Sequence, residues 1–346
     1  MDEKLYQKNG RESNNIQVGT INSFGLSYTE TKELCRDLIS DELSIYKNEA
    51  EIEAHRRNEK FLDDFILRLK DEKLTNEIVL EEFKNPDTQH CFVNAQKAFI
   101  RTGTPEMEEI LTRLMVDRIK ENKRTLLQIA LNEAITVVPL LLPEQFDILA
   151  LVFLLRYTIN NTIVSKETFK NYCKNYLLPQ IIGLNKKESL YQHIEYAKCG
   201  SITLAENRLS DIFSRRYRGL FLHGYTKHEI EDLSSKYPQL FTSCLNDVEL
   251  IQFNTINEDS LVNALKEYKM NEEEINRTVT LFNSNVMDNE KITSTVCDLV
   301  PDMKQLFEDW DNSSMKNLTL TSVGIVIGAT HLKERSEEKF DLNIWV

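Results

Sequence analysis

Apolar residues that recur at spacings of three and four positions constrain this sequence more than any other feature. From Leu34 to Leu69, leucine, isoleucine and phenylalanine follow this spacing, with charged residues between them. Such a pattern predicts amphipathic helices. Glycine (10) and proline (7) are scarce among 346 residues, so few positions carry the residues that end helices or shape β turns. We therefore expect a mainly α fold that starts with a long amphipathic arm, broken near Asn48.

The same spacing continues through the next half of the chain, and smaller helical pieces follow between 206 and 312. Ser27 with Glu30 fits a capping box, and Asp87, Thr104 and Ser165 are candidate N-caps. The predicted helices are 75–84, 87–101, 105–121, 123–138, 144–157, 166–181 and 187–198.

Both ends of the chain have a strand-like pattern instead. Residues 14–24 alternate polar and apolar positions, and 317–320 has the composition of a short strand before an apolar helix over 321–334. The terminal FDLNIWV also alternates, which predicts a strand over 340–346 that buries Phe340, Leu342, Ile344 and Val346 and pairs with 317–320. The expected fold is a multi-helix body with an N-terminal strand or hairpin and a small C-terminal β element.

This pattern suggests three regions: a strand-forming segment (1–26), a helical arm with an N-terminal helical domain (27–135), and a helical domain closed by the terminal strand (136–346). The stretch 134–155 is apolar enough to raise the question of a membrane segment. Pro139 and Pro143 interrupt it, and Glu144 and Asp147 would be costly in lipid. Two buried helices are the preferred interpretation, and a membrane-perturbing segment is the alternative.

Composition narrows the partners. A net charge of −13 argues against nucleic acid as the main ligand, although Arg215, Arg216 and Arg218 form a local basic patch.

Six cysteines lie singly, without a CxxC pair, which is typical of reduced thiols in a cytoplasmic protein. His193 and Cys199 share a helix face only loosely, so we predict neither a metal site nor a cofactor.

The segment NNIQVGTIN, 14–22, carries the clearest motif. Its I-Q-V-G core resembles the RIP homotypic interaction motif, in which short segments stack in register as a cross-β assembly. Amide side chains can form ladders along such a stack, and no charged residue between 14 and 28 opposes it. An ordinary edge strand and a strand shared within a finite oligomer remain alternatives. The predicted assembly residues are Asn15, Ile16, Gln17, Val18, Gly19, Ile21 and Asn22.

A second resemblance covers more of the chain. The opening NNIQVGTINSFGLSYTETKEL, the central LLRYT and the ending LTLTSVGIVIGATHLKERSEEKFDLNIWV resemble a bacterial family of similar length. That family begins with a Gln/Gly motif and a GLSYTE-type helix start, and ends in a DLxIW-type strand. Its members resemble proteins found around phage-defence genes. The resemblance therefore implies a context in antiviral defence without implying an activity.

The sequence contains no Walker A, GxGxxG, GxSxG or HExxH motif, so it predicts no familiar enzyme class. The two resemblances together imply a self-assembling or partner-binding component of an antiviral defence system, which contacts itself and another defence protein. The first alternative is an effector enzyme such as a nuclease, whose carboxylates meet only in the fold. The second is a membrane-perturbing effector that uses 134–155.

Overall fold

The computed structural model describes residues 28–43, 45, 48–181, 187–336 and 340–346. The assembly residues predicted between Asn15 and Asn22 lie outside these ranges, as does the proposed cap Ser27. The described part is mainly helical, as predicted, and its strands form two small two-stranded sheets. The α-helices of the N-terminal half are α1 Tyr28–Leu43, α2 Glu49–Asp71, α3 Asn76–Phe83, α4 Pro86–Thr102, α5 Pro105–Lys120, α6 Leu126–Val137, α7 Pro143–Tyr157 and α8 Lys166–Tyr172.

The C-terminal half contains shorter helices and all four strands. Its helices are α9 Glu188–Tyr196, α10 Leu209–Arg216, α11 Glu231–Lys236, α12 Glu258–Glu267, α13 Glu272–Ser284, α14 Asn289–Leu299, α15 Met303–Asp311 and α16 Ser322–Ser336. The strands are β1 Gly200–Ile202, β2 Phe241–Ser243, β3 Ile251–Phe253 and β4 Leu318–Leu320.

Local sequence signals account for many helix starts. Ser165 caps α8 and Asn271 caps α13, each in a capping box, and the arm breaks at Asn48, whose φ is 54°. Thr104 takes the N-cap position of α5 as predicted, but its side chain makes no capping hydrogen bond. The predicted cap Asp87 is wrong: Asn85 Oδ1 accepts from the Asp87 backbone N–H at 3.0 Å, because Pro86 takes the first helical position.

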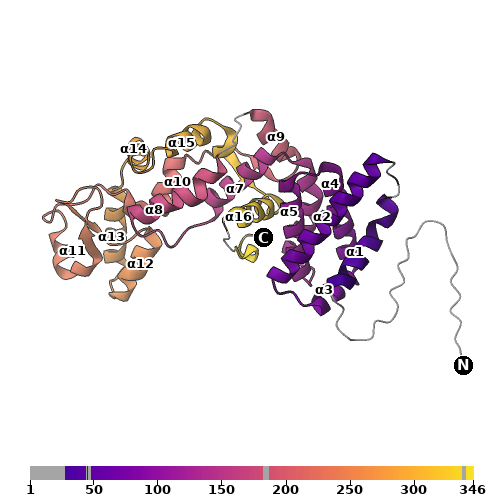
Figure 1. Cartoon of the computed structure of the whole chain (residues 1–346). Helices are drawn as coiled ribbons and strands as arrows, with labels where there is room; N and C mark the ends of the chain where they lie inside the picture. Colours follow the sequence, from indigo (N-terminus) through magenta and orange to yellow (C-terminus); the bar gives the residue numbers. More distant parts are fainter. Residues whose placement is uncertain (1–27, 44, 46–47, 182–186, 337–339) are drawn as a thin grey trace, which may run out of the picture.

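The molecule is elongated, with α1–α4 at one end and α11–α13 at the other (Figure 1). Between them, α7 and α16 lie at the centre, and most residues of each helix are buried. The main core runs through this centre and joins residues from both halves of the chain. A second, smaller core lies between residues 222 and 282 and includes Phe253 from β3 and Leu261 from α12.

The apolar stretch 134–155 folds as predicted for buried helices. It forms the end of α6, a 3-10 turn over Val138–Leu140 and then most of α7. Pro139 lies within the turn and Pro143 begins α7, so both prolines separate the two helices. Within the described ranges, every helix is too short or too polar to cross a membrane.

The chain end differs from the prediction. Residues 342–344 form a 3-10 turn because Asp341 Oδ1 accepts from the Asn343 backbone N–H at 3.1 Å. Ile344 is 70% exposed, whereas the predicted outward residue Trp345 packs its ring on Phe153 and donates from Nε1 to the Tyr157 carbonyl at 2.8 Å. Strand β4 forms as predicted, but it pairs antiparallel with β1. The predicted terminal strand and its pairing are therefore wrong.

Candidate functional site: a pocket lined by three arginines

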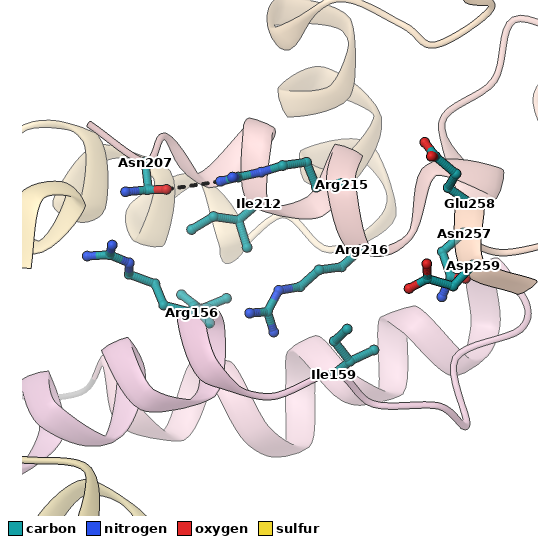
Figure 2. Close-up of a pocket in the computed structure, with 10 residues that line it drawn as sticks. Arg156, Ile159, Asn207, Ile212, Arg215, Arg216, Asn257, Glu258 and Asp259 are labelled. Carbon is teal, nitrogen blue, oxygen red and sulfur yellow. Dashed lines mark hydrogen bonds between the residues drawn. The ribbon is translucent and has the colours of Figure 1, made fainter. Parts of the chain in front are cut away.

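A pocket of about 330 Å³ lies where the main core meets the smaller core. Arg156 comes from the last turn of α7, and Arg215 and Arg216 come from the last turn of α10. The start of α12, Asn257 to Asp259, forms the opposite side. Figure 2 shows Arg156 and Arg216 reaching into the space between the two helices, with Asn257, Glu258 and Asp259 across it.

Two of the three guanidinium groups are held by neutral partners. Arg156 donates to the Leu318 carbonyl of β4, and Arg215 donates to Asn207 Oδ1 at 3.0 Å, a bond drawn in Figure 2. Within the described part of the chain, none of the three forms an ion pair with a carboxylate, and Arg216 has no hydrogen-bond partner. Three cations therefore share one pocket, and none of them is in direct contact with a carboxylate of the described residues.

The electrostatic cost of this arrangement appears in the pKa values. Burial lowers the pKa of Arg156, and the positive charge of Arg215 lowers it further. Burial also lowers the pKa of Arg216, and both Arg215 and Arg156 act in the same direction. Arginine remains protonated in proteins, so the positive charge persists. An anion in the pocket would relieve this repulsion.

The carboxylates at the start of α12 neutralise only part of this positive charge. Glu258 accepts from Asn283 Nδ2 at 2.9 Å and lies 3.7 Å from Arg218 Nη1. Asp259 is exposed and has no ion-pair or hydrogen-bond partner among the described residues. With Glu258 assigned to Arg218, three arginines and one free carboxylate leave a local charge of 3 − 1 = +2. The pocket is therefore a candidate anion-binding site.

The basic patch anticipated from the sequence is only partly in the pocket. Arg215 and Arg216 line it, whereas Arg218 lies over the Phe282 ring, with its guanidinium carbon 5.8 Å from the ring centroid. The third pocket cation, Arg156, was not predicted. Its signal in the sequence is a single charge directly after the apolar run that ends at Leu155.

The histidines and cysteines that are candidates for chemistry elsewhere in the fold make structural contacts or are buried. His331 Nε2 lies 2.8 Å from Asp147 Oδ1, and Arg335 binds the same carboxylate oxygen at 2.8 Å, so this cluster ties α16 to α7. His193 Nδ1 lies 3.1 Å from Gln145 Oε1 near the start of α7. Burial raises the pKa of Cys91 to about 11 and that of Cys199 to about 12, which keeps these thiols protonated and weakly nucleophilic.

The six cysteines are free thiols, as predicted. Across the ranges that the structure describes, no three histidine, cysteine, aspartate or glutamate side chains are grouped so that they could hold a metal ion. The arginine pocket is consequently the site whose geometry points most directly to a ligand.

Comparison with known proteins places the chain in a family. No curated protein and no solved structure matches the chain. A protein-family model matches residues 25–346. Because this match covers more than half of the sequence, the chain belongs to that family.

Proposed function

We propose that this protein is a self-assembling binding component of a bacterial antiviral defence system. In this proposal the helical body captures an anionic ligand in the arginine pocket, and residues 14–22 join copies of the chain. A second defence protein would bind the assembled form. The observation that carries the proposal is the pocket, in which Arg156, Arg215 and Arg216 converge without a carboxylate partner among the described residues.

The assembly part is supported by the I-Q-V-G pattern and by the absence of charge from Asn14 to Tyr28. The defence context is supported by the resemblance of the two chain ends to a family found near phage-defence genes. The binding part is supported by chemistry, because guanidinium groups can donate paired hydrogen bonds to the oxygens of an anion. These interactions are stronger where the groups are partly buried.

A stability measurement tests the binding part. Inorganic phosphate should raise the thermal unfolding midpoint of the wild-type protein, because a ligand that binds only the folded state stabilises it by mass action. Arg216→Gln should abolish most of this rise. Without phosphate this variant should be at least as stable as the wild type, because it removes a cation that its neighbours repel.

Two controls make the result specific. Arg277→Gln removes an exposed arginine on α13 with the same charge change, and should respond to phosphate as the wild type does. Sodium chloride at matched ionic strength separates binding from screening. If phosphate raises the midpoint of Arg216→Gln as much as that of the wild type, the pocket is not the anion site.

A further inference from the structure

We propose that the ligand of the arginine pocket is a nucleoside monophosphate. The three arginines would hold the phosphate, and the sugar and base would extend towards the start of α12. This inference rests on the proposed function, since it names the class of anion that the pocket takes.

The local charge favours a phosphate monoester. Three arginines and the free Asp259 carboxylate leave +2, and a phosphate monoester carries about −1.5 to −2 at neutral pH. A carboxylate ligand would neutralise only half of this charge, and a triphosphate would exceed it. The planar guanidinium group can also donate two parallel hydrogen bonds to phosphate oxygens.

The rest of the pocket suits a nucleoside better than a bare phosphate. Ile159 lines the pocket and is 49% exposed, so it offers apolar surface, with the buried side chains of Leu155 and Ile212 behind it. A base is flat and apolar on its faces, so it would cover this surface. Across the pocket, Asp259 offers an unpartnered carboxylate that can accept hydrogen bonds from sugar hydroxyl groups or from a base amino group.

Size and total charge exclude larger ligands of the same chemistry. The volume of about 330 Å³ lies at the small end of ligand pockets, which span roughly 300–1,000 Å³. A nucleic-acid strand would have to approach a protein with a net charge of −13, and such strands bind through extended rows of lysine and arginine. A single nucleotide matches the positive charge of the pocket and is too small to lie along the negatively charged surface of the rest of the protein.

The backbone around the pocket is fixed, so the two sides face each other before a ligand binds. The Gly219 N–H donates to the Ile256 carbonyl at 2.9 Å, and Gln252 Nε2 donates to the Gly219 carbonyl at 2.8 Å. These bonds link the chain just after α10 to β3 and to the chain just before α12. A preformed site loses less free energy on binding than a site that must be ordered.

Calorimetric titration of the full chain tests the inference. The probes are AMP, GMP, CMP and UMP, with ribose 5-phosphate and inorganic phosphate as ligands that lack the base or the whole nucleoside. At least one nucleotide should bind roughly tenfold more tightly than ribose 5-phosphate, which corresponds to about 1.4 kcal/mol. Arg216→Gln should weaken all phosphate ligands, whereas Arg277→Gln should weaken none.

Two further variants separate the parts of the ligand. Ile159→Ser should reduce the advantage of the nucleotide over ribose 5-phosphate and leave phosphate binding unchanged. Asp259→Asn should strengthen the binding of inorganic phosphate, because it removes a negative charge that repels the anion. The same change should reduce the extent to which ribose 5-phosphate binds more tightly than inorganic phosphate. Thermal unfolding of each variant confirms that it is folded before titration.

The outcomes distinguish this inference from the proposed function. If inorganic phosphate binds as tightly as every nucleotide and Arg216→Gln weakens it, the anion site stands and the nucleotide assignment is overturned. If neither the nucleotides nor phosphate bind, both proposals are overturned. Tight nucleotide binding that Arg216→Gln does not change would overturn the assignment to this pocket.

Discussion

At the residue scale, two glycines of α16 let the backbone of this helix pack directly against the backbone of neighbouring segments. A Cβ added to Gly324 would lie 1.8 Å from the Cys199 carbonyl oxygen, and one added to Gly328 would lie 2.6 Å from that of Leu149. The Cys199 carbonyl cannot move away freely, because it accepts from the Thr321 N–H at 3.0 Å. The sequence predicts α16 from its apolar pattern, but contacts between backbones distant in sequence leave no local signal.

Gly324→Ala should therefore destabilise the protein although alanine favours helices. Alanine gains about 1 kcal/mol in helix propensity over glycine, whereas forcing a group into a filled core costs about 1–3 kcal/mol. With a clash at 1.8 Å, we expect a net loss of about 1–2 kcal/mol in the free energy of unfolding, measured by urea titration. Ser322→Ala, at an exposed position on the same helix, is the control and should change little. A Gly324→Ala protein as stable as the wild type would refute the close approach.

At the element scale, a network of charges fastens α2, α5 and α16 together. Glu72, after the end of α2, pairs with Arg113 and Lys120 of α5 at 2.8 Å each. On α16, Glu334 pairs with Arg68 at 2.6 Å and with Arg113 at 2.5 Å. Burial raises the pKa of Glu72, but Lys120, Lys333 and Arg113 outweigh it and hold this pKa at about 2.

This network makes part of the stability depend on pH. The folded pKa of Glu72, about 2, lies below its ordinary value of 4.5, so its contribution is present above pH 4.5 and is lost as the pH falls towards 2. Glu72→Gln should reduce stability at neutral pH and flatten the fall in unfolding free energy across this window. The exposed Glu267→Gln serves as the matched control. An unchanged acid dependence in Glu72→Gln would contradict this account.

The C-terminal segment shows where sequence patterns fail. Its alternation predicts that Ile344 is buried and Trp345 outward, but the side chain of Asp341 turns the backbone and reverses these positions. Such a reversal depends on the slot beside Phe153, which lies far away in the sequence. By contrast, the starts of α8 and α13 are predictable, because each cap lies within three residues of its partner.

Trp345→Ala should cost about 2 kcal/mol of unfolding free energy, because it removes a half-buried ring and leaves the Tyr157 carbonyl without its donor. Ile344→Ala, at the neighbouring exposed position, should stay within about 0.5 kcal/mol of the wild type. Thermal unfolding compares the two variants directly. A larger loss for Ile344→Ala would restore the strand interpretation.

At the scale of the whole molecule, the arginine pocket lies between the two hydrophobic cores. Arg215 and Arg216 form a basic patch already in the sequence, whereas Arg156 is not predictable from it, because only the fold brings the end of α7 beside α10. The predicted assembly residues lie outside the described ranges, so their role remains a prediction. Self-association through 14–22 is therefore the central claim that needs a direct measurement.

Sedimentation velocity over a range of concentrations supplies that measurement. The wild type should form larger species as concentration rises, and Gln17→Asp with Val18→Asp should not, because like charges stacked at about 4.8 Å repel and are costly to desolvate. Gln7→Asp with Asn9→Asp adds the same charge outside the motif and should assemble like the wild type, and circular dichroism should show the same helical body in all three. A Gln17→Asp, Val18→Asp protein that assembles as the wild type does would contradict the account.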